Sequence, residues 1–420
     1  MTLHNALTGA ELHETKGAAA ATKGFTLIAN GAGTAAYQAL LGNVVHVNLL
    51  SDLPTAAAGK ITLLANTIYL FGASVNIGTD FLLFSNGSSI QCLAAFTSTV
   101  TYTGTVPMLQ GDNANARIKD INLLCATANV YGWADSTPGT SIVIITDVLV
   151  IACLKVGVFN DVGTLVIQGS TVVSCTSGIT YLGSGISGTR LSSINFISTS
   201  TTFIGLDFTG ATLNNVNVDG MQMSGGVGSI GIKGDAASVN LAANRIGHVS
   251  HVQFQGITTP LSGITLDDIR WNFQANGDLA DTMPDALTSL TANAAATVVS
   301  VGVPTLVTGT WVQVRASQYS TTAAGRITLL SERDVVTPID VTISVEPVSG
   351  TNKILRAYIA LNGAAIIASG ISTHADNADP RVISIPWQLN LSETDFVEVF
   401  VENETDSVDI LVSDATLRVR

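Results

Sequence analysis

Pairs of aspartates are the residues in this sequence whose type and spacing come nearest to a catalytic pattern. Glycoside hydrolysis normally uses two carboxyl groups about 5–9.5 Å apart. The chain has no glutamate over residues 15–331, so a pair in its middle must consist of two aspartates. The candidates are Asp120 with Asp147, and the adjacent Asp267 and Asp268.

Both pairs also have a structural interpretation. Aspartates beside turns commonly accept hydrogen bonds from backbone N–H groups. Adjacent residues of a strand point to opposite faces, so Asp267 and Asp268 would not face one substrate. The chain also lacks a Gly-x-Ser-x-Gly elbow, a phosphate-binding loop and a His-Glu-x-x-His motif. We therefore expect binding rather than catalysis, and an Asp pair stays as the alternative.

No metal site or cofactor is expected. His4, Glu11, His13 and Glu14 are spaced as ligands could be, but a flexible terminus rarely holds ligands in the geometry that a metal needs. The cysteines form no Cys-x-x-Cys pair, so zinc is not indicated, and we expect buried free thiols with the last three stacked in successive coils. The cysteines are Cys92, Cys125, Cys153 and Cys175.

The composition indicates an all-β protein. Charged residues make up 12% of the chain, against about 25% in ordinary domains. The surface must therefore consist largely of Ser, Thr, Asn and Gly, which suit exposed strands and turns. The formal net charge is −13 without a cluster of Lys and Arg, so nucleic-acid binding is not expected. The apolar run at residues 141–159 is β-branched and contains Asp147 and Lys155, which predicts a buried strand and no membrane insertion.

A short pattern of one polar, one aliphatic, one variable and one large apolar residue recurs in the middle of the chain. Its copies are Asp120-Ile-Asn-Leu123, Asp147-Val-Leu-Val150, Ser170-Thr-Val-Val173, Ser193-Ile-Asn-Phe196, Gly220-Met-Gln-Met223, His251-Val-Gln-Phe254 and Asp268-Ile-Arg-Trp271. A period of about 25 residues with alternating strands is typical of a solenoid, and irregular coils favour a right-handed parallel β-helix. The residues expected to stack inward are Ile121, Val148, Ile194 and Val252.

The start of this region adds a family resemblance. Residues 59–71 alternate as a strand, and a second strand at residues 81–84 ends in the tight turn Asn86-Gly87. This order resembles the opening coils of the pectate-lyase-like β-helices of bacteriophage tailspikes.

The N-terminus carries the more specific resemblance. It is similar to the virion-attachment segment of phage tail fibres and spikes, with Thr15 where that segment commonly has Pro. The matching residues are Thr8, Gly9, Glu11, Leu12, His13, Glu14, Lys16 and Gly17.

The C-terminal region reads as an antiparallel β-domain. Residues 311–315, 341–345 and 396–401 alternate cleanly between apolar and polar, which predicts a sandwich or jelly roll. Residues 387–403 resemble the late strands of TNF/C1q-like jelly rolls, a resemblance that implies a trimer.

Two polar segments supply the candidate receptor-binding residues, because sugars present both C–H faces and hydroxyls. Tyr131, Trp133 and Asp135 lie in what we interpret as a loop between coils, with packing against a neighbouring subunit as the alternative for Trp133. His374 and Asp376 lie in a polar loop of the C-terminal domain, for which plain solvated surface is the alternative.

The resemblances together imply an elongated homotrimeric phage spike or fibre protein on the virion surface. It would join virion proteins through its N-terminus and bind a host-surface receptor, and glycan is the receptor class that the resemblance implies. The alternatives are a polysaccharide depolymerase tailspike that uses an Asp pair, and a capsid-decorating head spike. The expected domains are an attachment segment (1–25), a neck (26–58), a parallel β-helix (59–275), a linker (276–286) and a jelly-roll domain (287–420).

Overall fold

The computed structural model describes residues 26–29, 35–38, 43–184, 188–235, 240–243, 245–332 and 334–420, the first two ranges by their backbone alone. The attachment-like motif and His4 lie outside the described residues. The chain divides into two compact units, Met1–Asp235 with His251–Gly263, and Ala236–Ser250 with Ile264–Arg420. In the described part, no helix is long and apolar enough to cross a bilayer.

A short antiparallel pair precedes the first coil. It consists of β1 (Thr26–Ala29) and β2 (Ala35–Gln38). The 3-10 turn η4 (Leu50–Asp52) follows the first strand of the solenoid.

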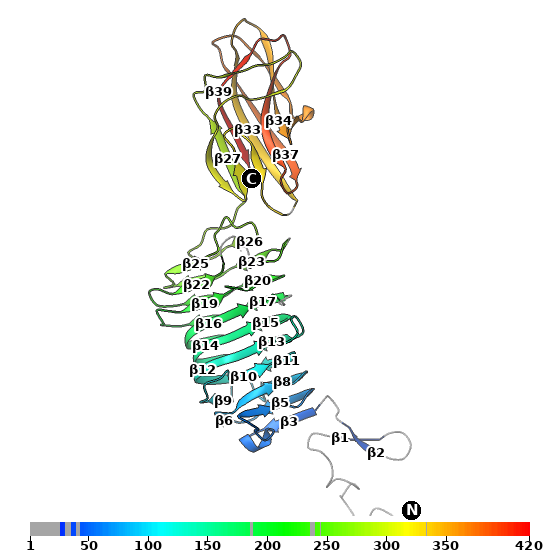
Figure 1. The fold of residues 1–420 in the computed structure, drawn as a ribbon, viewed down its shortest axis with the longest axis vertical. Coiled ribbons are helices and arrows are strands. Elements are labelled where there is room, and N and C mark those ends of the chain that lie inside the picture. The colour runs from blue at the N-terminus through cyan, green and yellow to red at the C-terminus, as the bar shows by residue number, and fades with distance from the viewer. Residues whose placement is uncertain are drawn as a thin grey trace, which may run out of the picture. The chain divides into compact units, whose positions relative to one another are not determined.

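Parallel strands stack coil upon coil in a solenoid, whose sides we name faces A, B and C (Figure 1). Face A holds β3 (Asn43–Val47), β5 (Thr67–Phe71), β8 (Ser88–Cys92), β11 (Ala116–Lys119), β13 (Ile142–Thr146), β15 (Thr164–Gln168), β17 (Gly188–Ser192) and β20 (Val216–Asp219). Face B holds β6 (Val75–Gly78), β9 (Thr99–Tyr102), the first halves of β12 (Asn122–Ala134), β14 (Leu149–Asn160) and β16 (Thr171–Leu182), then β18 (Asn195–Ile197), β21 (Gln222–Ser224) and β24 (Gln253–Gln255). Face C holds β4 (Lys60–Thr62), β7 (Phe81–Phe84), β10 (Leu109–Gly111), the second halves of β12, β14 and β16, then β19 (Ile204–Asp207), β22 (Ile230–Lys233) and β25 (Thr259–Ser262). In the second unit, β23 (Gly247–Ser250) and β26 (Trp271–Gln274) pair in parallel.

The recurring sequence pattern marks the corner between faces A and B. Its polar first residue ends the face-A strand in the left-handed conformation, as at Asp120 (φ 53°) and Asp147 (φ 54°). Aspartate accepts this conformation more readily than most residues with a Cβ, because its short polar side chain can hydrogen-bond locally. The next residue then points into the core. The four residues expected to face inward, Ile121, Val148, Ile194 and Val252, are all buried, as predicted.

Two copies of the pattern were placed wrongly. Thr171 pairs with Leu149, so Ser170 and not Thr171 occupies the inward position of its coil. Gly169 occupies the corner there (φ 64°), because glycine adopts a positive φ readily. Since the recurring pattern begins with a polar residue at most corners, a glycine corner is not recognised from the pattern. The copy at 268–271 is no corner to face B, since Trp271 opens β26 and pairs with Gly247.

The cysteine stack is confirmed, but two of its members are not free thiols. Cys125, Cys153 and Cys175 are register partners in successive coils. A disulfide joins Cys153 and Cys175, whose Cα atoms lie 4.5 Å apart as in-register neighbours do. Cys92 and Cys125 are free and buried, and burial raises the pKa of Cys125 to about 11.

Two antiparallel sheets form the C-terminal domain and share one apolar core. The first holds β30 (Val312–Ser317), β27 (Asp285–Leu290), β39 (Ile410–Val419), β33 (Val335–Pro347) and β37 (Arg381–Leu391), with β28 (Ala296–Thr297) beside β39. The second holds β31 (Tyr319–Thr321), β32 (Ile327–Leu329), β38 (Phe396–Asn403), β34 (Lys353–Leu361) and β35 (Ala364–Ala365), with β29 (Thr305–Leu306), β36 (Ile371–Ala375) and the turn η5 (Ile367–Ser369) at its margins.

The predicted class is confirmed as all-β, with a parallel solenoid followed by antiparallel sheets. The handedness of the coils, the jelly-roll connectivity, the trimer and the domain boundaries stay predictions.

Candidate functional site

The interpretation of Tyr131 and Trp133 as residues of an exposed loop is wrong. Both belong to β12 and keep only 1% of their surface exposed. The Trp133 ring lies 5.2 Å from the Phe84 ring, and its Nε1 donates to Ala114 O at 3.3 Å. Tyr131 packs 6.2 Å from Phe159, and burial raises its pKa above the ordinary value. Side chains inside the solenoid cannot contact a sugar, so Tyr131 and Trp133 are not proposed as receptor-binding residues.

Asp135 holds a turn together in the same coil. Its carboxylate accepts hydrogen bonds from Asn113 N (3.1 Å), Ser141 N (2.7 Å) and Thr140 Oγ1 (3.3 Å), and also from Ser141 Oγ. With 5% of its surface exposed, this carboxylate is already satisfied by neighbouring backbone and hydroxyl groups. Asp135 is therefore committed to the turn.

The aspartates considered for catalysis have structural positions as well. Asp120 and Asp147 are left-handed corner residues, and Asp120 Oδ2 lies 3.1 Å from Lys119 Nζ. Asp268 is nearly buried and accepts from Arg270 N at 3.0 Å, whereas Asp267 is exposed. Among the described residues, no group of three or more His, Cys, Asp and Glu side chains is placed to hold a metal ion.

The predicted loop residues of the C-terminal domain lie in an ordered polar cluster, which we name the tip cluster: Asn352, His374, Asp376, Asp379 and Arg381. His374 is the penultimate residue of β36, its side chain is exposed, and its Nδ1 lies 3.2 Å from Asn352 Oδ1. Asp376 accepts a hydrogen bond from Asn352 N. Arg381 Nη2 lies 2.6 Å from Asp379 Oδ2. Exposed carboxylate, amide, imidazole and guanidinium groups thus share one surface, and receptor binding by His374 and Asp376 stays a proposal.

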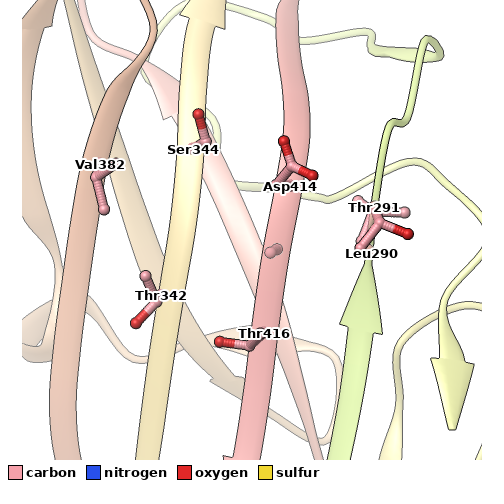
Figure 2. Close-up of a pocket in the computed structure, with 8 residues that line it drawn as sticks. Leu290, Thr291, Thr342, Ser344, Val382, Asp414 and Thr416 are labelled. Atoms are coloured by element: carbon pink, nitrogen blue, oxygen red, sulfur yellow. The ribbon is translucent and has the colours of Figure 1, made fainter. Parts of the chain in front are cut away.

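A second surface lies on the outer side of the sheet formed by β27, β39, β33 and β37. One row of small hydroxyl side chains crosses these strands in register, and we name it the hydroxyl face: Ser289, Thr416, Thr342 and Ser384. Thr342 Oγ1 and Ser384 Oγ lie 3.4 Å apart. Figure 2 shows side chains of neighbouring strands around the shallow hollow beside this row. The hollow measures about 210 Å³ and is lined by Leu290, Thr291, Thr342, Ser344, Val382, Asp414, Ala415 and Thr416.

Charged side chains lie on both sides of the hydroxyl row: Asp414 lines the hollow on one side, and ion pairs lie on the other. Asp285 pairs with Arg315 at 2.5 Å and with Arg418 at 3.3 Å. Asp340 pairs with Arg420 at 3.0 Å. The hydroxyl row itself carries short, neutral side chains, which lose little rotamer freedom when another surface covers them, provided that their hydroxyls find hydrogen-bond partners there.

The hydroxyl face was not predicted from the sequence, although the strands that form it carry a signal. Thr342 and Ser344 alternate with buried Val and Ile in β33, and Ser384 and Thr416 do so in β37 and β39. Only the register of the strands shows that these hydroxyls form one row.

Comparisons with known proteins give weak likenesses. No family model matches the chain, and no curated protein matches it either. Among solved structures, full-length tailspike protein 2 of an Escherichia coli bacteriophage is similar at 11% identity over 96% of this chain and 71% of that one, with a TM-score of 0.29. The PRD1 vertex protein is similar at 16% identity over 33% of this chain and 96% of its own, with a TM-score of 0.24. Murine APRIL is similar at 9% identity over 32% of this chain and 98% of its own, also with a TM-score of 0.24. At such identities and TM-scores, the fold rests on the strand pairing of this chain alone.

Proposed function

We propose that this chain is the subunit of a homotrimeric phage spike or fibre that binds a host-surface glycan. The support comes from the parallel solenoid joined to an antiparallel domain and from the attachment-like motif over residues 8–17. In this proposal the N-terminal segment joins virion proteins, the sandwich holds the subunits together, and the tip cluster meets the receptor.

The hydroxyl face is the observation that carries the proposal. Cores of subunit interfaces are depleted of charged side chains and pack as tightly as protein interiors. The row Ser289, Thr416, Thr342 and Ser384 offers such a surface, with Val382 exposed beside it. The same sheets of two further copies, meeting around a threefold axis, would cover these groups, and the carboxylate of Asp414, which accepts a hydrogen bond from Ala292 N, would then need a partner from a neighbouring copy.

The oligomeric state tests this step. Native light scattering of the wild-type chain is expected to give the mass of a trimer. Thr342→Arg places a long cation in the neutral row and is expected to yield monomers, because an unpaired buried charge is costly. Val227→Arg is the control, since Val227 is 83% exposed in the solenoid. A monomeric wild type, or a trimeric Thr342→Arg variant, would contradict the proposal.

Receptor binding is tested separately, by adsorption of the purified protein to host cells. His374→Ala is expected to reduce adsorption strongly while the melting temperature stays unchanged, because the His374 side chain is exposed. His248→Ala, which removes an exposed imidazole from β23, should leave adsorption unchanged. Equal adsorption by both variants would remove His374 from the receptor site.

A further inference from the structure

One inward position of the solenoid carries a serine where its neighbours carry aliphatic side chains. At the corner between faces A and B, this position is held in four successive coils by Ile121, Val148, Ser170 and Ile194. All of these residues are buried. Protein interiors are close-packed, and serine has a smaller side chain than valine or isoleucine, so its coil keeps unfilled space next to a hydroxyl group.

A small internal cavity lies beside Ser170. It is lined by Ser170, by Tyr131 and by apolar side chains, and none of the lining residues has more than 4% of its surface exposed. The volume of the cavity, measured for the centre of a water molecule, is about 10 Å³. The molecule itself sweeps more than this, and about 10–15 Å³ of swept volume is enough for one water. The cavity therefore has room for a water molecule.

The Tyr131 hydroxyl is the second polar group of the residues that line this cavity. Tyr131 pairs with Gly157 of the next coil, and a Cβ added at Gly157 would lie 3.0 Å from Tyr131 Cβ. A glycine at this place thus leaves room for the Tyr131 side chain beside β14. Tyr131 is 1% exposed and, among the described residues, its hydroxyl has no hydrogen-bond partner. Burying a hydroxyl group without a partner is costly, and native structures rarely do so.

The Ser170 hydroxyl can take a further hydrogen bond. Its Oγ donates to Gln168 O at 3.3 Å and accepts from Val148 N at 3.4 Å, and both distances are long for hydrogen bonds. A hydroxyl oxygen has two lone pairs, so one of them is still available to a donor in the cavity.

We propose that one water molecule is bound in this cavity and bridges the hydroxyl groups of Tyr131 and Ser170. The tyrosine hydroxyl donates to the water oxygen, and the water donates one of its hydrogens to Ser170 Oγ. This water gives the buried tyrosine its partner and fills the space that the serine leaves in an aliphatic column. It also connects β12 to the residue before β16, two coils further on. The proposal goes beyond receptor binding and does not rest on it.

A double-mutant cycle tests whether the two hydroxyl groups share a water. Urea unfolding of the full chain, at one protein concentration, gives the ratio of unfolded to folded protein. Tyr131→Phe and Ser170→Ala are each expected to raise this ratio by about five-fold, as the loss of one hydrogen bond does. In the double variant the two effects should add up to clearly less than their sum, because each change removes a partner of the same water.

Tyr181→Phe is the matched control for Tyr131→Phe. Among the described residues, the Tyr181 hydroxyl is also buried without a hydrogen-bond partner, but Tyr181 does not line the cavity. Removing a buried hydroxyl that has no partner does not lower stability and can raise it. We therefore expect the urea midpoint of Tyr181→Phe to stay at the wild-type value or to rise, whereas that of Tyr131→Phe falls.

A high-resolution crystal structure of the full chain gives an independent measurement. Electron density for one atom is expected within hydrogen-bond distance of both Tyr131 Oη and Ser170 Oγ. A cavity without such density, a Tyr131→Phe variant at least as stable as the wild type, or fully additive losses in the cycle would each overturn the proposal.

Discussion

Replacing Trp133 with Ala tests most directly whether this residue packs the core or meets a ligand. Its indole is 1% exposed, so the change removes almost the whole ring from the interior. Burial of an aromatic side chain removes about 150–250 Å² from water, which at about 25 cal/mol per Å² amounts to about 4–6 kcal/mol as an upper estimate. Losses measured for buried Trp or Phe to Ala are about 3–5 kcal/mol, and we expect a value in this range.

Gly111→Ala tests the same packing by adding a methyl group beside the indole of Trp133 instead of removing the ring. Gly111 pairs with Trp133, and a Cβ added there would lie 2.2 Å from the indole Cε2. The overpacking should cost about 1–3 kcal/mol. Gly188→Ala is the matched control, because it also adds one carbon to a solenoid strand but meets nothing within 4 Å.

The assay is urea unfolding followed by tryptophan fluorescence and circular dichroism, at one protein concentration because an oligomer's apparent stability depends on it. We expect the Trp133→Ala and Gly111→Ala midpoints to fall and the Gly188→Ala midpoint to stay. An unchanged Trp133→Ala midpoint together with lost adsorption to host cells would refute the packing argument and restore a binding role.

Four further outcomes are expected. Val148→Asp should lower stability by several kcal/mol, about 2 or more, and reduce the yield of folded protein, because it buries an unpaired carboxylate; a normal melting temperature would show that the coil register is wrong. Cys125, whose pKa is raised to about 11 by burial, should resist alkylation at pH 8 until urea exposes it, and peptide mapping would detect early modification. The hydrogen bond from Lys353 lowers the pKa of Asp406. The stability that this bond contributes is therefore present above the ordinary aspartate pKa and is lost as the pH falls through the lowered pKa. Lys353→Met should raise the pKa of Asp406 in a carboxyl NMR titration, and an unchanged titration would show that the bond is not made. Deleting residues 1–17 should leave a folded trimer that no longer joins virions, and normal incorporation would contradict the attachment role.

Much of the solenoid was predictable because its signal is local and repeated. The inward positions of Ile121, Val148, Ile194 and Val252 follow from one short pattern at each corner. The pattern failed at Gly169, where glycine takes the left-handed corner and shifts the apparent copy by one residue.

The candidate sites were less predictable because they depend on pairing between distant strands. Trp133 sits among polar residues and reads as a loop, yet β12 continues through it and turns the ring inward. The disulfide between Cys153 and Cys175 likewise could be predicted only from the strand register, because the two cysteines are 22 residues apart in the sequence.

The stacking of in-register coils has a consequence for how the solenoid opens. In such arrays each repeat contacts its neighbours only, so cooperativity spreads from one interface to the next and not through a global core. The disulfide fastens β14 to β16, two of the long strands that run across faces B and C. Amide exchange should therefore be slowest in the disulfide-linked strands β14 and β16 and faster toward both ends of the solenoid. Heat or mechanical force should unfold the coils one after another from the ends inward.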